Sequence, residues 1–426
     1  MIIHRDTFLA PFQDKTVRRW CLALSGGMDS VALLHFLRYK LHTSLPIVAL
    51  HVNHHLQAAA DAWQTFCVEL CENWQVPLQI LSVDIVRGTG DSLEATARVA
   101  RYEALFSQLR AGDVLLTAHH ADDQAETVLL QLLRGAGPKG LAAMPLQIEN
   151  KSGVIQYRPF LNTTRAAIAM YVKENQLKHI DDLSNEDIAF DRNYLRQHVI
   201  PLLQQRWPSY AKTLSRSAQL SAELINWATP LWQTALEACV DAQKPKCLDR
   251  HKLMRFSSYE CSEILRLWLE QQGFALPSLA QMQQLLNLVY QYRADSQAAV
   301  KWGDVVIRVY QQHLYALSLR DTIPRLGVFP WTEFDNTLRI ENLHLQAKKI
   351  EGQGIALTYL QDCEVRFREE GERFHAAGRV GSHPLKKLFQ EWGIPPWQRA
   401  RIPLIYAQGE LIAVIGFACH ADKLAA

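Results

Sequence analysis

Short apolar segments alternate with longer stretches of helical periodicity along the first third of the chain. The apolar segments are rich in Leu, Val, Ile and Ala, and their length is typical of strands buried on both faces. Strands are therefore expected at residues 21–24, 47–52, 78–85 and 114–118. Helices are expected at residues 30–39, 61–74, 92–109 and 122–133. This alternation predicts an α/β fold with an open parallel sheet, right-handed connections and helices on both faces.

The rest of the chain changes character twice, and its 426 residues are too many for one ordinary domain. Further helices are expected at residues 162–176 and 191–205, then almost without interruption from 215 to 291, and once more near 384–391. A strand pair is expected at about 300–319, and residues 320–330 read as a linker. We therefore expect three domains: an α/β domain at 1–214, a mainly helical domain at 215–325 and a small mixed α/β domain at 331–426.

The overall composition excludes several classes of protein. The net charge is only +2, so any affinity for nucleic acid must come from local basic regions. The eight cysteines are scattered without a CxxC pair, which favours buried thiols in a reducing compartment over disulfides or a metal cluster. The first fifteen residues lack the apolar core of a secretory signal, and no apolar run reaches the roughly 18 residues of a membrane span. We expect a cytoplasmic protein without membrane contact.

The hexapeptide SGGMDS, at residues 25–30, follows the first expected strand and opens the first expected helix. Glycines allow close backbone approach, and the amides of a helix start suit an anion. The loop lacks the lysine of a P-loop and instead carries Asp29, which would repel a triphosphate unless a cation lay between them. Magnesium binds carboxylate and phosphate oxygens together. The loop therefore indicates Mg–ATP, with Asp29 as metal ligand; an ordinary Gly-Gly turn is the alternative. The predicted ATP-binding residues of the loop are Ser25, Gly26, Gly27, Met28, Asp29 and Ser30.

A second polar cluster, AHHADDQAET, follows the fourth expected strand. Ligands of open parallel sheets bind outside such strand ends, so His119 is a candidate phosphate donor. Asp123 and Glu126 are three residues apart on one helix face and could hold magnesium or an ammonium group. The alternative is compensation of the helix dipole by acidic residues. A zinc site at His51 is not expected, because no cysteine lies near it. His51 is expected near adenine or ribose.

Several motifs resemble the N-type ATP pyrophosphatases, also called the PP-loop superfamily, and within them the tRNA(Ile)-lysidine synthase family. The SGGxDS loop is followed, in the family's order, by HVNHHL, SLEATARVARYEAL, LLTAHHADDQAETVLLQLLRGAGPKGLAAM, RPFL and DDLSNEDIAFDRNYLRQHVIPLL. The last ninety or so residues resemble the C-terminal domain of the longer form of these enzymes. The middle helical part matches mostly by position.

The resemblance implies an ATP-dependent ligase that modifies a tRNA. ATP would activate the C2 carbonyl oxygen of the wobble cytidine in the CAU anticodon of an isoleucine tRNA. Free lysine would then attack C2 through its ε-amine, so that AMP leaves and lysidine forms. The resemblance implies ATP and Mg²⁺ as cofactors, Asp29, Asp123 and Glu126 as catalytic residues, and His51 and His119 near the nucleotide. A homodimer is a further expectation.

Two regions combine basic and aromatic side chains, as RNA-binding surfaces do. Residues 191–216 carry five basic side chains against one acidic, and residues 366–401 carry eight against four. For both regions the alternative is a solvated helix face. Arg98 and Arg101 fit a salt-bridged exposed helix face as well as they fit contact with the nucleotide or the RNA. The predicted tRNA-binding residues are Arg98, Arg101, Arg192, Arg196, Arg206, Arg373, Arg379, Lys386, Lys387 and Arg399.

Three other functions fit the same motifs less well. A tRNA thiolase of this superfamily needs cysteines that relay sulfur or hold an iron–sulfur cluster, but only Cys21 lies near the loop in sequence. A non-catalytic RNA-binding protein with a relict nucleotide fold would not need the complete loop and the HHADDQAET cluster. A glutamine-dependent amidotransferase is disfavoured because no cysteine follows Met1.

Overall fold

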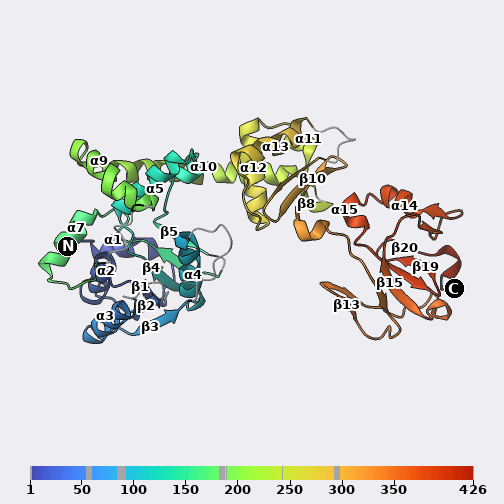
Figure 1. Cartoon of the computed structure of the whole chain (residues 1–426), viewed down its shortest axis with the longest axis horizontal. Helices are drawn as coiled ribbons and strands as arrows, with labels where there is room; N and C mark the ends of the chain where they lie inside the picture. Colours follow the sequence, from blue (N-terminus) through green and yellow to red (C-terminus); the bar gives the residue numbers. More distant parts are fainter. Residues whose placement is uncertain are drawn as a thin grey trace. The chain divides into compact units, whose positions relative to one another are not determined.

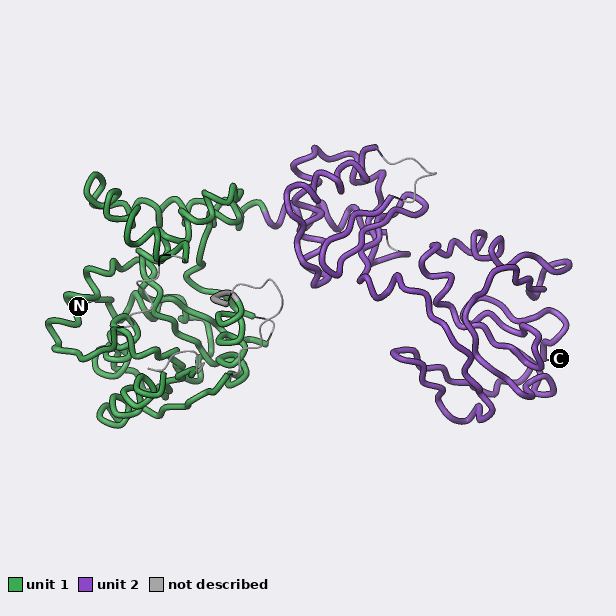
Figure 2. Tube along the Cα trace, viewed as in Figure 1, with its two compact units in different colours: residues 1–228 green, residues 229–426 purple. Residues whose placement is uncertain are grey.

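The computed structural model describes residues 2–53, 60–83, 93–150, 152–181, 188, 190–241, 243–291 and 298–425, with side chains in all of these except 93–95. The chain forms two compact units, residues 1–228 and 229–426, which are described separately (Figure 2). The histidines of HVNHHL after His51, the start of the helix expected at residue 92 and most of DDLSNED lie outside the described residues.

The first unit is built on a six-stranded sheet with the order β3-β2-β1-β4-β6-β5 (Figure 1). Five neighbouring strands are parallel, and only β5 runs antiparallel to its neighbour β6. The strands are β1 (Arg19–Ala23), β2 (Ile47–Asn53), β3 (Leu78–Ser82), β4 (Asp113–Leu116), β5 (Gln147–Glu149) and β6 (Ile155–Tyr157). The fold class and the four expected strands are confirmed, whereas β5 and β6, at three residues each, are too short to produce a periodic signal.

Helices cover both faces of this sheet because successive strand residues point to opposite sides. Leu22 and Leu116 pack with α2 and α7 in one core cluster, and Cys21 and Leu115 pack with α4 in another. The α-helices up to residue 174 are α1 (Arg5–Leu9), α2 (Met28–Tyr39), α3 (Ala60–Asn73), α4 (Leu93–Ser107), α5 (Ala121–Leu133), α6 (Pro138–Leu141) and α7 (Arg165–Glu174). The helices expected in this region are confirmed to within a few residues at each end.

The helix expected at residues 191–205 is confirmed as a continuous helical segment with a local irregularity. It consists of α8 (Asp191–Tyr194), a π-helical stretch (Leu195–Val199) and α9 (Ile200–Arg206). A π-helical turn widens the helix by one residue and is frequent at functional sites. Here it carries Arg196, whose partners are described below.

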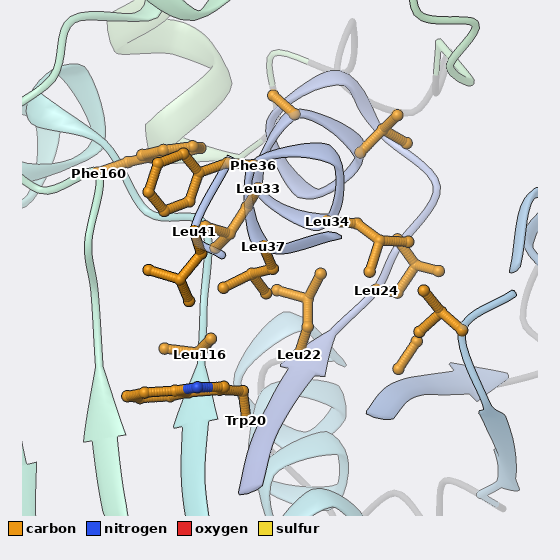
Figure 3. Close-up of a cluster of buried hydrophobic side chains, with 14 of the residues drawn as sticks. Trp20, Leu22, Leu24, Leu33, Leu34, Phe36, Leu37, Leu41, Leu116 and Phe160 are labelled. Carbon is orange, nitrogen blue, oxygen red and sulfur yellow. The ribbon is translucent and has the colours of Figure 1, made fainter. Parts of the chain in front are cut away.

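The main core lies between α2 and the sheet (Figure 3). Leu33, Phe36 and Leu37 of α2 are at most 1% exposed and face Trp20 and the strand residues around it. The N-terminal segment adds aromatic rings to this core, and the ring of Phe8 meets that of Trp20 edge-on at 5.2 Å. Each such apolar side chain contributes about 1.5–3 kcal/mol when it is fully buried. This core fixes the start of α2, and therefore the SGGMDS loop, against the end of β1.

The second unit contains more strand than the sequence predicts. A five-stranded antiparallel sheet has the order β7-β8-β11-β10-β9. Its strands are β7 (Val240–Asp241), β8 (Lys244–Asp249), β9 (Ala299–Trp302), β10 (Val305–Tyr310) and β11 (His313–Ser318). The expectation of almost uninterrupted helix from 215 to 291 is wrong at 240–249, because the polar sequence of β8, KPKCLD, lacks the alternation of a half-buried strand. Three strands replace the expected pair at 300–319.

Helices pack on this sheet, and one of them spans the expected domain boundary. The helices are α10 (Tyr210–Cys239), α11 (Arg250–Leu253), α12 (Ser258–Gln271) and α13 (Leu279–Tyr290). Helix α10 passes through residue 214, where the first domain is expected to end, and the first compact unit ends inside the same helix. The three-domain division stays a prediction.

The C-terminal part of the second unit has its own antiparallel sheet, with the order β12-β15-β18-β19-β20. Its strands are β12 (Val328–Pro330), β15 (Cys363–Phe367), β18 (Pro403–Ala407), β19 (Glu410–Val414) and β20 (Ala418–Cys419). Two small hairpins, β13 (Leu338–Ile340) with β14 (Leu343–Leu345) and β16 (Arg373–Phe374) with β17 (His383–Pro384), accompany it. Helices α14 (Leu385–Glu391), which confirms the expected helix, and α15 (Pro396–Arg399) complete this part. None of the described helices combines the length and apolar character needed to cross a membrane.

Leu33→Ala should lower the free energy of unfolding of the first unit by about 2–5 kcal/mol, because it leaves a cavity beneath α2. The measurement is hydrogen exchange of β1 peptides at increasing urea concentrations. Exchange in β1 reports on the unfolding of this unit alone. Leu132→Ala, on α5 and 57% exposed, is the control and should change the value by less than about 0.5 kcal/mol. Equal effects of the two substitutions would contradict the assigned core.

Candidate active site

The strand order creates a crevice at the carboxyl ends of β1 and β4. From β1 the chain proceeds outward to β2 and β3, and then returns to place β4 on the other side of β1. Connections leave such a switch point in opposite directions, so a cavity opens between them. A cavity of about 510 Å³ lies at this point. Its lining includes Ser25, Gly27, Met28, Asp29, Ser30, His51, Trp63, Arg101, Tyr102, His119, Asp123, Arg165, Ile180 and Asp181.

The SGGMDS loop is braced by its own hydroxyl groups. Ser30 Oγ donates to the Gly27 carbonyl at 2.9 Å and accepts from the Ser25 amide at 3.3 Å. Ser25 Oγ lies 3.1 Å from Ser30 Oγ. Gly27 is the N-cap of α2 and offers no side-chain cap, so the first-turn amides keep their capacity to bind an anion.

Gly26 is required by the close approach of a distant segment. Its φ is +84°, and a Cβ at this position would lie 2.7 Å from Ile180 Cδ1. The Ile180 amide donates to the Gly26 carbonyl at 2.9 Å, so the chain after α7 pairs with the loop. Ile180 and Asp181 line the cavity; Asp181 opens the DDLSNED motif, but neither residue was predicted as a site residue.

Asp29 holds a carboxylate oxygen that lacks a partner. Asp29 Oδ2 lies 3.6 Å from His120 Nε2, whereas Oδ1 is buried and accepts no hydrogen bond from any described residue. Burial raises the pKa of Asp29, and the charge of His120 opposes that rise. A buried acceptor without a donor costs free energy unless a proton or cation binds it. The observed donor set therefore fits a magnesium ion at Asp29 Oδ1.

His120 and Asp123 form a reciprocal cap at the start of α5. The Asp123 amide donates to His120 Nδ1 at 3.3 Å, and the His120 amide donates to Asp123 Oδ2 at 3.0 Å. Burial alone would raise the pKa of Asp123, but His120 and Arg196 hold it below its usual range. The cap therefore presents an ionised carboxylate to the cavity at the start of α5, which follows β4, whereas Asp29 lies at the start of α2, which follows the neighbouring strand β1.

Glu126 is occupied by an arginine and does not line the cavity. Arg196 Nε donates to Glu126 Oε1 at 2.5 Å, and its Nη2 donates to Glu126 Oε2 at 2.9 Å and to Asp123 Oδ1 at 3.0 Å. Glu126 is 2% exposed; burial raises its pKa and the Arg196 hydrogen bonds oppose that rise. A guanidinium thus lies where the sequence suggested a metal or an ammonium group. In this structure Glu126 positions Arg196, whose guanidinium binds two protein carboxylates, and a contact between Arg196 and RNA stays a prediction.

Asp122 ties three helices together at the same corner. Its Oδ2 accepts from the Arg165 amide at 2.7 Å, at the start of α7. Its Oδ1 accepts from the Tyr210 hydroxyl at 2.8 Å, at the start of α10. Because both oxygens are used, Asp122 is a positioning residue that fixes α7 and α10 beside the cap of α5.

The two predicted histidines lie on either side of the cavity and are neutral. His51, at 5% exposure, donates through Nδ1 to the Leu24 carbonyl at 2.9 Å. Burial lowers the pKa of His51. Burial also lowers the pKa of His119, to about 3. His119 Nδ1 lies 3.0 Å from Thr117 Oγ1. A neutral imidazole can donate one N–H to a phosphate or a nucleoside without adding charge.

The predicted RNA-binding arginines of the first unit differ in their surroundings. Arg98 and Arg101 both stack on the ring of Tyr102, at 5.3 and 5.7 Å from its centre, and Arg101 lines the cavity. Arg192 donates to Thr127 Oγ1 at 3.3 Å, and Arg206 is exposed. Tyr102 was not predicted, although its spacing of four residues from Arg98 was a usable signal.

In the second unit four of the five predicted basic residues are exposed. Arg373, Arg379, Lys386 and Lys387 lie at the surface, with Arg379 paired to Glu391. The prediction for Arg399 is wrong: it is 6% exposed, and its Nε donates to the Ile394 carbonyl at 2.9 Å. The neighbouring Trp397 packs edge-on against Tyr315 at 5.3 Å. A local count of charges cannot distinguish a solvated arginine from one that caps a buried turn.

Family models match three segments of the chain. A PP-loop domain matches residues 3–203, a TilS substrate binding domain residues 248–315, and a TilS substrate C-terminal domain residues 363–426. The tRNA(Ile)-lysidine synthase of Coxiella burnetii is 38% identical over 405 residues, covering 93% of this chain and 88% of the relative. That of Serratia proteamaculans is 39% identical over 406 residues, with 94% and 91% covered. The chain belongs to the tRNA(Ile)-lysidine synthase family.

The family is a branch of the PP-loop enzymes, and ATP is its energy source. The U34-tRNA thiolase NcsA of Methanococcus maripaludis superposes with a TM-score of 0.43 at 16% identity, covering 51% of this chain and 78% of that structure. That likeness is too low to indicate function.

The cysteines near the loop lack the properties of a sulfur relay. Cys21 and Cys67 are fully buried, and burial raises their thiol pKa to about 11 and about 12. A relay needs an accessible thiolate at neutral pH. Thiolation is therefore not favoured, in agreement with the family assignment.

Arg196→Ala should lower the free energy of unfolding of the first unit by about 3 kcal/mol. This value is the lower end of the range for breaking a buried ion pair, because the Arg196 side chain is partly exposed. The loss arises because Glu126 remains buried without its partner. Adding Glu126→Gln should recover much of the loss, and urea denaturation of the four species of this cycle measures the coupling. Arg206→Ala is the exposed control. If Arg196→Ala were as mild as Arg206→Ala, the pair would not hold this corner together.

Proposed function

We propose that the protein ligates free lysine to C2 of the wobble cytidine in the CAU-anticodon isoleucine tRNA, with ATP as the activating substrate. The products are lysidine in the tRNA, AMP and pyrophosphate. Two observations support the proposal together. The family relationship extends over nearly the whole chain, and the unpartnered Asp29 oxygen lies beside an anion-binding helix start.

The first step requires a pyrophosphate leaving group to be stabilised. The cytidine C2 oxygen attacks the α-phosphorus of ATP, and the bond to the β,γ-pyrophosphate breaks. The first-turn amides of α2, made accessible by Gly26 and Gly27, bind the departing phosphates. Asp29 would hold Mg²⁺, which when bound supplies positive charge to the phosphate oxygens. His119 donates its N–H to a phosphate oxygen, and because it is neutral it leaves this charge balance unchanged.

The second step requires a neutral amine close to the activated base. The lysine ε-amine attacks C2, a C–N bond forms, and AMP departs with the former C2 oxygen. The ε-amine must be uncharged to attack, so it is not the group that a carboxylate holds. A protein carboxylate binds the α-ammonium of the lysine. Asp123 lines the cavity and is held ionised, so we assign this contact to it. Arg196, which already bridges Asp123 and Glu126, fixes the orientation of the carboxylate.

The tRNA backbone is assigned to basic side chains of both units that are at least partly exposed. Arg101, which stacks on Tyr102 as Arg98 does, lines the cavity that must receive an unstacked base. Lys386 and Lys387 on α14 supply charge for phosphate contacts elsewhere on the RNA. A cytoplasmic location follows from a tRNA substrate, and a homodimer stays a prediction.

The decisive assay incubates the protein with ATP, Mg²⁺, radiolabelled lysine and the CAU-anticodon isoleucine tRNA, and counts label in the RNA. Wild type should incorporate label. Asp29→Asn should lower the rate at least about 100-fold, because it removes charge that acts in the transition state. Asp6→Asn, an exposed aspartate of α1, is the matched control and should retain the wild-type rate.

Other outcomes of this assay point elsewhere. Pyrophosphate release without labelled RNA would preserve the ATP chemistry and exclude lysine as the nucleophile. Absence of both from folded protein would contradict the enzyme assignment and favour an RNA-binding role.

Lys386→Ala and Lys387→Ala should each weaken tRNA binding and reduce the salt slope of log Kd by about 1, if each side chain contacts one phosphate. Fluorescence anisotropy with labelled tRNA at several salt concentrations measures both quantities. Lys173→Ala, an exposed lysine at the end of α7, is the control. An unchanged slope in both variants would remove α14 from the RNA-binding surface.

A further inference from the structure

Two histidines and an aspartate converge in the C-terminal part of the second unit, remote in sequence from the PP-loop. One ligand atom each of His375, His420 and Asp422 lies within 4.8 Å of the other two. The backbone holds the two segments together, because the Ala421 amide donates to the His375 carbonyl at 2.9 Å and the Ala377 amide to the Cys419 carbonyl at 2.9 Å. The histidines are therefore fixed by main-chain pairing before any ligand binds.

The hydrogen bond from His375 to the Arg379 carbonyl decides which ring nitrogen carries the hydrogen. Nε2 lies 3.0 Å from the Arg379 carbonyl, which can only accept, so Nε2 carries a hydrogen. Nδ1 then lies 3.2 Å from Asp422 Oδ2. A nitrogen lone pair and a carboxylate oxygen repel at this distance unless a proton or a cation lies between them. Orientation of a ligating histidine by a backbone carbonyl on its far nitrogen is typical of metal sites.

His420 is held by a hydrogen bond of its own. Its Nδ1 accepts from the Asp422 amide at 3.3 Å and lies 3.9 Å from Asp422 Oδ2. Its Nε2 then carries the hydrogen, with Glu410 Oε1 at 3.8 Å. Coordination through Nδ1 would replace the long hydrogen bond from the Asp422 amide, and Glu410 would remain behind the other nitrogen, as carboxylates do in zinc sites. Metal–ligand bonds of about 2.0–2.2 Å place tetrahedral ligand atoms roughly 3.3–3.5 Å apart, so the ligand atoms, which lie within 4.8 Å of one another, would have to draw together.

We propose that His375, His420 and Asp422 bind a divalent transition metal ion, with Zn²⁺ as the reference ligand. Two imidazoles and one carboxylate favour such an ion over Mg²⁺, which prefers oxygen ligands. Asp422 has an exposed side chain, at 73%, so the site is accessible from solvent. The ion joins residues 375–377 to residues 420–422 and adds a cross-link near the last strand of the sheet.

The test is titration of the full-length, chelator-treated protein with Zn²⁺ by calorimetry, in parallel with Co²⁺, whose visible absorption reports coordination geometry. Wild type should bind Zn²⁺ at a site that His375→Ala and Asp422→Asn remove. Glu410→Gln, which leaves all three ligands in place, should weaken this site about tenfold. His344→Ala, an exposed histidine of β14 in the same unit, is the matched control and should titrate as wild type.

Zinc bound at the PP-loop cavity would persist in His375→Ala and in Asp422→Asn, so the variants separate the two sites. If His375→Ala and Asp422→Asn both titrate as wild type, or if wild type binds no Zn²⁺, the proposal is wrong. In that case the 3.2 Å contact is an ion pair between a protonated His375 and Asp422. Circular dichroism of each variant, with unchanged spectra expected, keeps loss of binding distinct from loss of folding.

Discussion

The partly buried carboxylate of Asp29 is the feature on which the rest of the site depends. It lies at the start of α2, beside the carboxyl end of β1, with one oxygen near His120 and the other accepting no hydrogen bond from the residues that the structure describes. A negative charge at a phosphate-binding helix start is unfavourable by itself. It becomes favourable when a cation joins the carboxylate to a bound phosphate. The surrounding architecture holds this arrangement before the substrate arrives.

Each neighbouring element contributes a specific constraint. The strand order places β4 next to β1, so the cap of α5 brings His120 and Asp123 to the same crevice. Asp122 holds the starts of α7 and α10, and Arg196 neutralises carboxylates that would otherwise repel a triphosphate. The resulting balance of charge is local: an ionised Asp123, neutral His51 and His119, and an arginine already paired. Preorganisation of this kind lowers the reorganisation needed when charge develops in the reaction.

The sequence predicted the parts of this design that are local. The four long strands and the helices between them were visible as apolar runs and helical periods, and Asp29 was identifiable because its charge conflicts with an anion site. The short β5 and β6 and the polar β8 were not visible, since pairing with distant strands stabilises them. Ile180 and the partners of Arg196 and Arg399 depend on tertiary contacts, so spacing along the chain could not reveal them. Charge counts located basic regions but not which side chains are solvated.

The central claim is that the site adenylates the tRNA before lysine takes part. The most direct measurement mixes the protein with Mg²⁺, the CAU-anticodon isoleucine tRNA and ATP labelled at the α-phosphorus, omits lysine, and follows label in the RNA after rapid quenching. The account predicts that labelled AMP appears on the tRNA and is released when lysine is added. If AMP never joins the RNA while lysine-dependent ligation proceeds, activation through the C2 oxygen is contradicted.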